Sequence, residues 1–453
     1  MLLPERYRAA EMQLNAATRD ERLAAVRLLA QGLTTGEIPP IPRTMEVNNH
    51  VHTCYSFSPH SPSSAAWHAS RAGLQAVGIM DHDAVAGVPE MLEAGELLGI
   101  ATTAGFEVRV NFDDTPFAGR VINGPGLTGV AYIALHGIPA TALASCDAFL
   151  RPIRRARNAR NAAMVERLNA VLQPRGVPQI DYQRDVYAAS LAAEGGTISE
   201  RHLLAALSRK LIEAHGMGAP LVAFLEGPLG LSLPARARGY LLDQQNPHYL
   251  YDLLGLLKAY YTDDFFIHPD HTECLNVREV LMFSEAIGAI SAYAYLGDVT
   301  ESPTGDKKAE LFEDTFLEEL LLCLRELGFR AITYMPPRNT PAQLARIASL
   351  CEQHGFMQIS GVDINSSRQT FNCPELLDPR FANLITATWA LIGHEKLSTI
   401  ASGHGIFGAG TCARFPTLAE RLSLFARIGQ GLDPHAPTQL PDALAALVQP
   451  LAV

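Results

Sequence analysis

Two histidines separated by one residue are the first feature of the sequence that could do chemistry. His50 and His52 lie in the segment 45–53, whose pattern predicts a strand. Alternate side chains of a strand point to the same side, so both imidazoles can face one point. Two neutral imidazoles arranged in this way form a chelate for Zn, Mn or Fe. The alternative interpretation is a polar pair that faces solvent.

Acidic groups end the predicted strands that follow. These groups are Asp81 with His82 and Asp83, then Glu107, and finally Asp363. A carboxylate at the end of a buried strand is costly unless it is paired or binds a metal. With the two histidines, these groups predict a site for a divalent ion, which can lower the pKa of bound water and polarise a phosphoryl oxygen. Nothing in the sequence resembles a Ser/His/Asp elbow or a P-loop.

The elements that position these groups are short apolar runs that alternate with amphipathic helical segments. The predicted strands are 45–53, 74–83, 100–110, 129–137, 264–269, 289–298, 330–337 and 357–365, and several of the helices between them end at Gly. Strand–helix alternation predicts a parallel sheet, and this number of units predicts a distorted TIM-like β/α barrel of about seven parallel strands. Polar groups at the carboxyl ends of its strands, now including His136 and Asp298, would share the rim where ligands bind.

Three segments depart from this alternation. Residues 141–255 are mostly helical and predict an inserted cap on a barrel of 45–370. Residues 1–44 predict an N-terminal helical segment, and 371–453 predict a C-terminal helical extension. We interpret the basic run RRARNAR in the cap as a solvated helix face, and His394, Glu395 and His404 as structural.

Composition limits the class of protein. With 48% hydrophobic and 18% charged residues, the chain can bury a sizeable core. Its formal net charge of −11 disfavours general binding to nucleic acid or to anionic membranes. The seven cysteines are scattered without a CxxC pair, and the N-terminus lacks the pattern of a secretory signal, so we expect a cytoplasmic protein without a membrane span.

Five motifs carry a resemblance to a known family. The segments HVHTCYS, GIMDHDAVAG and GFEV, followed by TISERHLLAAL and ISGVDINSSRQ, resemble the PHP superfamily (polymerase and histidinol phosphatase domain) over roughly 45–370. The resemblance implies a distorted β/α barrel with a metal cluster at the strand ends. It also implies hydrolysis of phosphate esters by a metal-bound water, with Arg201 and His202 near the substrate.

Four positions depart from the family pattern. Phe57, Tyr132, Tyr295 and Asn365 stand where the family usually has metal ligands. The resemblance leaves His50, His52, Glu107 and Asp363 for one ion, and His82 with His136 or Asp298 for a second. Asn365 stays a candidate ligand. We therefore expect one or two ions of Mn, Zn or Fe rather than three.

Polar loops supply candidates for substrate binding. Lys307, Lys308, Arg338 and Arg368 could bind a phosphate, and Arg is suited to bidentate capture. Ordinary solvated loops are the alternative for each of them. Asp81 or His202 could assist proton transfer if the geometry allows it.

Three functions remain open from the sequence. The first is a metal-dependent hydrolase of a small phosphorylated metabolite. The second is a metal-dependent amide or lactone hydrolase, because fold does not fix function. The third is a degenerate, non-catalytic barrel that binds a ligand. The charge and the lack of a polymerase-sized extension disfavour a proofreading role on DNA.

Overall fold

A sheet that closes into a barrel forms the centre of the computed structural model, which describes residues 3–124, 126–299 and 311–441. Its strands, in spatial order, are β1 (Val47–Val51), β2 (Ala76–His82), β3 (Ala101–Asn111), β4 (Val130–His136), β6 (Ile290–Tyr295), β7 (Ala331–Tyr334) and β8 (Met357–Ser360). The two-residue strand β5 (Leu275–Asn276) pairs with β3 outside this path. The predicted distorted TIM-like barrel is confirmed.

Backbone hydrogen bonds just beyond β8 join it to β1 and close the barrel. The N–H of His52 donates to the carbonyl of Ile364 (3.0 Å), and the N–H of Ile364 donates to the carbonyl of His50 (3.2 Å). The side-chain amide of Asn48 makes two further bonds with the backbone of Val362. The segment that carries Asp363 is thereby held against the segment that carries His50 and His52.

Helices cover the outside of the barrel. They are α3 (Pro62–Arg71), α4 (Val88–Leu98), α10 (Val277–Ile287), α11 (Leu317–Leu327) and α12 (Pro341–His354). The expected glycine ends are present, since Gly99 and Gly355 terminate α4 and α12 with φ of 63° and 73°. Both faces of the strands are therefore covered, and this agrees with their nearly continuous burial.

Two of the sequence predictions on strands need correction. Strand β4 runs antiparallel to both β3 and β6, whereas the other six strands run parallel to one another. The described residues between β3 and β4, 112–124 and 126–129, contain no crossover helix, and an antiparallel pair needs none. The predicted strand 264–269 is absent: its apolar residues belong to the end of α9 (Tyr249–Phe265) and to the loop after it.

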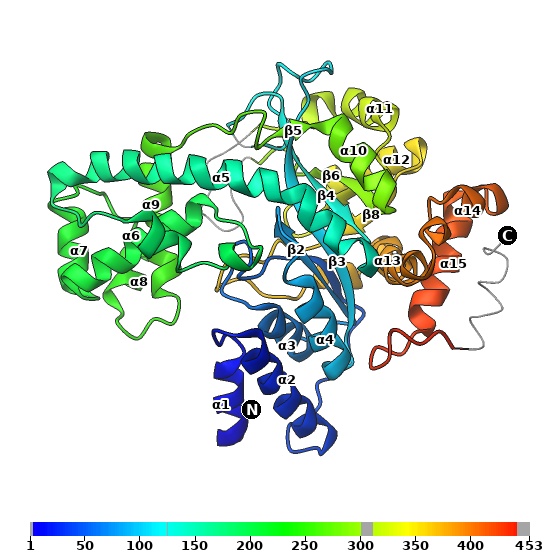
Figure 1. The fold of residues 1–453 in the computed structure, drawn as a ribbon, viewed down its shortest axis with the longest axis horizontal. Helices are drawn as coiled ribbons and strands as arrows, with labels where there is room; N and C mark the ends of the chain where they lie inside the picture. Colours follow the sequence, from blue (N-terminus) through cyan, green and yellow to red (C-terminus); the bar gives the residue numbers. More distant parts are fainter. Residues whose placement is uncertain (1–2, 125, 300–310, 442–453) are drawn as a thin grey trace.

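A group of helices between β4 and β5 has a hydrophobic core of its own. It comprises α5 (Leu143–Leu172), α6 (Glu200–His215), α7 (Ala219–Glu226), α8 (Ala235–Leu242) and α9. Figure 1 shows α5 leaving the barrel and reaching the group formed by α6 to α9. These helices include most of the segment 141–255, and we refer to α5–α9 as the cap.

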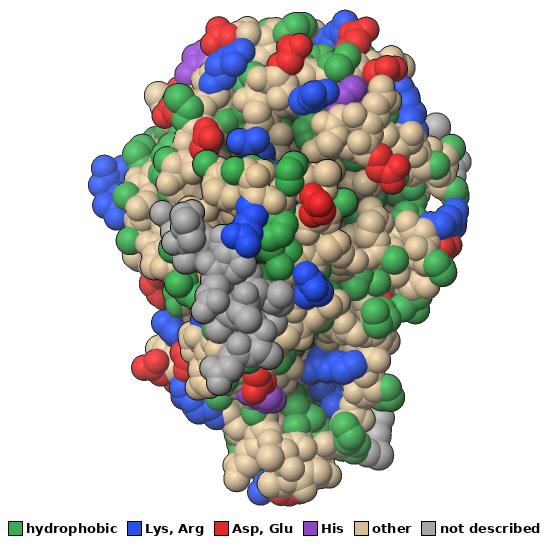
Figure 2. All heavy atoms as spheres, turned by 90° about the vertical axis from the view of Figure 1, so that its right-hand side faces the viewer, with side chains coloured by type: hydrophobic (Ala, Val, Ile, Leu, Met, Phe, Trp, Pro, Cys, Tyr) green, Lys and Arg blue, Asp and Glu red, His purple; other side chains and the backbone are tan. Residues whose placement is uncertain are grey.

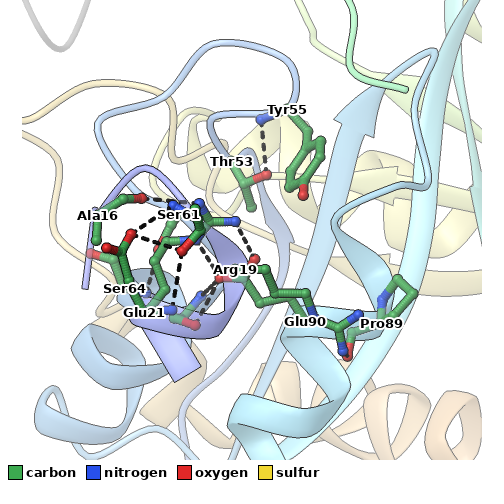
Figure 3. A network of polar contacts seen from close by, with 12 residues as sticks. Ala16, Arg19, Glu21, Thr53, Tyr55, Ser61, Ser64, Pro89 and Glu90 are labelled. Carbon is green, nitrogen blue, oxygen red and sulfur yellow. Dashed lines mark hydrogen bonds and ion pairs between the residues drawn. The ribbon is translucent and has the colours of Figure 1, made fainter. Parts of the chain in front are cut away.

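The two ends of the chain pack on the barrel at different places. The N-terminal helices α1 (Glu5–Gln13) and α2 (Arg19–Thr34) dock on α3 and α4, where buried Arg22 makes two hydrogen bonds with Glu90. Figure 3 shows the polar contacts around Glu90 and Ser61 at this junction. Helices α13 (Ala382–Ile400) and α15 (Leu418–Gly431) pack together on another side of the barrel.

Two further features are the charge distribution on one face of the molecule and the hydropathy of its helices. Figure 2 shows basic and acidic side chains interspersed on the face that carries the C-terminal helices. None of the described helices is both long and apolar enough to cross a bilayer.

Candidate metal centre

The register of three neighbouring strands brings the predicted metal ligands together. Strands β1, β2 and β3 are parallel, and His82 lies directly opposite Glu107. His50 and His52 lie at the same end of the adjacent strand. One ligand atom from each of His50, His52 and Glu107 lies within 4.8 Å of the other two. The sheet therefore brings His50 and His52 from the end of β1 close to Glu107 on β3. His82, at the end of β2, lies beside Glu107.

Short distances continue through this cluster. Nε2 of His50 lies 2.9 Å from Oε1 of Glu107, and Nδ1 of His82 lies 3.1 Å from Oε2 of the same carboxylate. Nε2 of His52 lies 3.1 Å from Oδ1 of Asp363. These five residues, His50, His52, His82, Glu107 and Asp363, are called the ligand cluster below.

The ligand cluster fits a divalent ion. Nε2 of His50 and Nδ1 of His82 are buried, and neither makes a hydrogen bond of acceptable geometry within the described part of the chain. Buried polar atoms are rarely left in this state unless a water or an ion completes them. Three imidazoles and two carboxylates form the mixed nitrogen and oxygen set that suits Zn, Mn or Fe.

Charges within the ligand cluster depend on one another. Burial opposes the charged form of His50, but the adjacent Glu107 carboxylate outweighs burial and raises the pKa of His50 to about 9. Burial likewise opposes the charged form of Glu107, yet His50 and its neighbours lower the pKa of Glu107 to about 2. Burial, with His52, lowers the pKa of His82 to about 3. A neutral His82 can offer its lone pair to a cation.

Asp81 lies behind the ligand cluster and does not line the cavity described below. It accepts hydrogen bonds from the Thr53 N–H, the Thr53 hydroxyl and the Ser56 hydroxyl, each at 2.6 Å. Because Ser56 gives its only hydroxyl proton to Asp81, it accepts from Nδ1–H of His52, 3.3 Å away. The Nε2 lone pair of His52 is thus directed toward the other ligands, which is the usual arrangement of a metal-binding histidine.

Asn365 lies beside Asp363 as a donor. Its side-chain Nδ2 donates to Oδ1 of Asp363 (2.6 Å), and its backbone carbonyl accepts from the Arg201 guanidinium (3.2 Å). Arg201 belongs to the first turn of α6 in the cap. The pair Asn365 and Arg201 therefore links the cap to the carboxylate at the end of the barrel.

Four of the predicted site residues are not part of the ligand cluster. His136 is buried at the end of β4 farther from the rim, because that strand is reversed, and it pairs with Gly105 on β3. Burial, with nearby His50, lowers the pKa of His136 to about 3. The carboxylate of Asp298 accepts from the Phe312 N–H (2.7 Å). His202 caps its own helix through the Ser199 N–H (3.1 Å) and packs edge-on against Phe57. Lys307, like Lys308, lies outside the described residues.

A cavity of about 220 Å³ opens on the ligand cluster, and all five of its residues line the cavity. Four cations line it as well: Arg157, Arg201 and Lys258 from the cap, and Arg338 from the loop after β7. Its remaining wall includes the aromatic side chains Phe57, Tyr132, Tyr295 and Tyr334. Arg368 is paired with Asp252 (2.7 Å) and does not line the cavity.

The basic run in the cap is not the solvated face that the sequence suggests. Arg154, Arg157 and Arg160 follow one another at helical spacing and turn one face of α5 toward the barrel. Arg157 pairs with Asp83, Arg154 donates to the Asp83 carbonyl (3.0 Å), and Arg160 pairs with Glu273 (2.5 Å). A run of arginines on a helix is exposed unless acidic partners lie opposite, and the sequence does not reveal such partners.

Asn123 and Tyr132 also line the cavity. Nothing in the sequence indicates Asn123, and Tyr132 stands out there only as a departure from the family pattern. The Asn123 side chain accepts from the Tyr132 N–H (2.7 Å) and donates to the carbonyls of Tyr132 (2.8 Å) and Ala294 (2.6 Å). It thereby fills the gap where β4 and β6 separate. The departure of Tyr132 from the family pattern is the one signal that marks this position.

A family profile and several solved structures match this chain. The PHP domain profile matches residues 48–319. A candidate metal-dependent phosphoesterase from Bifidobacterium adolescentis is 19% identical, with a TM-score of 0.47, covering 75% of this chain and 96% of that one. An amidohydrolase from Chromobacterium violaceum, solved with sulfate and without metal, is 17% identical, with a TM-score of 0.46, covering 72% and 90%.

A search of curated proteins gives no match. The two solved structures are too distant to carry an argument about activity. The profile match spans more than half of the sequence and includes the ligands on β1, β2 and β3. On this evidence the chain belongs to the PHP domain family.

Proposed function

We propose that this protein is a metal-dependent phosphoesterase that hydrolyses a small phosphorylated molecule. The observation that supports this function best is the pairing of two features in one cavity. The ligand cluster lines it together with four cations, Arg157, Arg201, Lys258 and Arg338. A phosphate ester carries negative oxygens that cationic side chains such as these attract.

The ligand cluster would hold one or two divalent ions. A bound ion of this kind supplies Lewis acidity and lowers the pKa of coordinated water. Asp81 and Ser56 fix the tautomer of His52, and Asn365 orients Asp363. These contacts keep the ligands in place before substrate arrives, which lowers the cost of reorganisation during the reaction.

The cations would position the phosphate. A guanidinium can bind two phosphoryl oxygens at once, so Arg201 and Arg338 are suited to orient the group. Lys258 lies 3.5 Å from Glu200, which also lines the cavity, and can shift between this carboxylate and an anionic ligand. His202 holds the first turn of α6 and thereby the position of Arg201.

Metal analysis combined with a substrate screen tests this function. The purified protein is assayed for Mn, Fe and Zn by elemental analysis and then against a panel of phosphate monoesters with each metal. We expect at least one ion per chain and turnover of one or more esters, and we expect His50→Ala to abolish both. His271→Ala is the matched control, because the His271 side chain is 81% exposed and outside the cavity.

Other outcomes would contradict the proposal. A protein that binds metal but cleaves only amides or lactones would be a hydrolase of another class. A protein that binds no metal and cleaves no ester with added Mn would be a ligand-binding barrel without catalysis.

A further inference from the structure

The hydroxyl of Tyr132 is held as an acceptor by Arg109. The two residues lie directly opposite each other on β4 and β3. Nε of Arg109 donates to the Tyr132 oxygen (3.1 Å), and Nη2 of the same guanidinium donates to it as well. Arginine has no acceptor atom, so the hydroxyl proton of Tyr132 must point away from Arg109.

Arg109 itself is fixed by a buried carboxylate. Nη1 of Arg109 donates to Oε1 of Glu273 (3.0 Å), and both side chains are almost fully buried. The backbone of Tyr132 is fixed independently by the side chain of Asn123. The phenol is therefore held at both ends, and its oxygen has little freedom to leave the guanidinium.

Tyr132 lies in the wall of the cavity. Tyr132 lines the cavity together with His82 and Glu107, and its ring centroid lies 5.6 Å from that of His82. Within the described part of the chain, no acceptor takes the proton of Tyr132. Two other tyrosines of the lining differ in this respect: Tyr295 donates to Asp314 (2.6 Å), and Tyr334 donates to Gln358 (3.0 Å).

We propose that the Tyr132 hydroxyl donates a hydrogen bond to the leaving oxygen of the substrate. This inference rests on the proposed phosphoesterase function. When the bond between phosphorus and the leaving oxygen breaks, that oxygen gains negative charge. A donor polarised by Arg109 stabilises this charge, and it is placed before the reaction begins. Water supplies both the oxygen that joins phosphorus and the proton that ends on the alcohol, so Tyr132 is unchanged after each turnover.

The dependence on leaving group provides the test. Tyr132→Phe keeps the ring and removes only the hydroxyl. For 2-glycerol phosphate, whose alkoxide is a poor leaving group, we expect kcat to fall by about 100-fold or more. For 4-nitrophenyl phosphate, whose leaving group needs little stabilisation, we expect a loss of less than about 3-fold, because a donor stabilises only the charge that develops on that oxygen. KM should change little for either ester.

Two further measurements separate catalysis from structure. Metal content and the affinity for inorganic phosphate, measured by calorimetry, should match the wild-type protein in Tyr132→Phe. Tyr293→Phe is the control, since Tyr293 lies on the neighbouring strand β6, opposite Ile133, and does not line the cavity.

Three results would overturn the inference. An equal loss on both esters, or no loss on either, would assign Tyr132 a structural role. Loss of metal from Tyr132→Phe would place Tyr132 in ion binding instead. If the wild-type protein cleaves no phosphate ester, the proposed function fails first and this inference fails with it.

Discussion

Asp81 reaches His52 through one intervening hydroxyl group. Ser56 donates to Asp81 at 2.6 Å and accepts from His52 at 3.3 Å, so the carboxylate determines which nitrogen of the imidazole carries the proton. The sequence placed Asp81 among the catalytic candidates because it ends a strand beside the site. Its contacts are those of a residue that orients a ligand.

Replacing Asp81 with Asn should therefore weaken metal binding. The amide introduced by this change could turn its NH₂ group toward Ser56, and this would release the His52 tautomer. We expect Asp81→Asn to lower the affinity for Zn or Mn by about 10-fold to 100-fold, as changes behind metal-bound histidines usually do. Competition with a chromogenic chelator measures the affinity, and Ser56→Ala should shift it in the same direction. An unchanged affinity in both variants would show that the relay has no influence on the ion.

Gly361 controls how closely the barrel closes at the ligand cluster. A Cβ atom at this position would lie 2.4 Å from Cβ of His50 and 2.7 Å from its backbone nitrogen. Such distances force one of the two segments to move, and the shift separates His50 from Asp363. We expect Gly361→Ala to reduce metal content and to lower the free energy of unfolding by about 1–3 kcal/mol.

Gly119→Ala is the matched control for this variant, since a Cβ atom there meets no atom within 4 Å. Elemental analysis and urea unfolding measure the two effects. Full metal content in Gly361→Ala would mean that the closing segments adjust without disturbing the ligands.

The proximity of His50, His52, Glu107 and Asp363 could be predicted from the sequence. His50 and His52 come from the end of β1 and Glu107 from β3, which both run parallel to β2 between them, and Asp363 follows β8 where the barrel closes. The rule that carboxyl ends share one edge therefore applies directly. The same rule misplaces His136, because it assumes that every strand runs in the same direction. Strand β4 is reversed, and this brings Tyr132 rather than His136 toward the rim.

The burial of Arg157 in the cap could not be predicted from the sequence, for a different reason. Arg157 belongs to a basic helical run that would normally face water. It is 3% exposed because Asp83 and Glu273, far apart in the sequence, both lie against it. Pairing between distant segments leaves no local pattern, so neither this contact nor the bridge made by Asn123 could be read from one sequence.

The pair formed by Arg157 and Asp83 should be strongly coupled. Removing one partner of a buried ion pair leaves an uncompensated charge, so Arg157→Met should cost about 3–5 kcal/mol of stability. The double variant with Asp83→Asn should be more stable than the sum of the two single losses predicts, by at least about 1 kcal/mol. Urea unfolding of the four proteins gives the coupling. Additive losses would show that the cap is held by its other contacts, such as Arg160 with Glu273.

The free energy of unfolding should decrease as the pH is lowered, because His394 is buried in its neutral form. Its Nε2–H donates to the Gly288 carbonyl (2.9 Å), and its Nδ1 accepts from the Ile406 N–H (3.0 Å), so the folded protein holds the neutral ring. Burial lowers the pKa of His394 from its ordinary value of 6.5 to about 4. Above pH 6.5 the ring is neutral in both states, and it has no effect on the pH dependence.

Between pH 6.5 and 4, His394 is protonated in the unfolded chain but stays neutral in the folded protein. The free energy of unfolding should therefore fall by about 1.4 kcal/mol per pH unit for this one group. Half-buried His60 and His202, whose pKa values are lowered to about 3 by loss of hydration, add to the slope of the wild-type protein. In urea unfolding at pH 7, 6 and 5, His394→Gln should reduce the slope, whereas His271→Gln at an exposed position should not. The pH dependence of the unfolding free energy arises only from a difference in bound protons between the folded and unfolded states. If His394→Gln and the wild-type protein show the same pH dependence, His394 takes up its proton in the folded state as well.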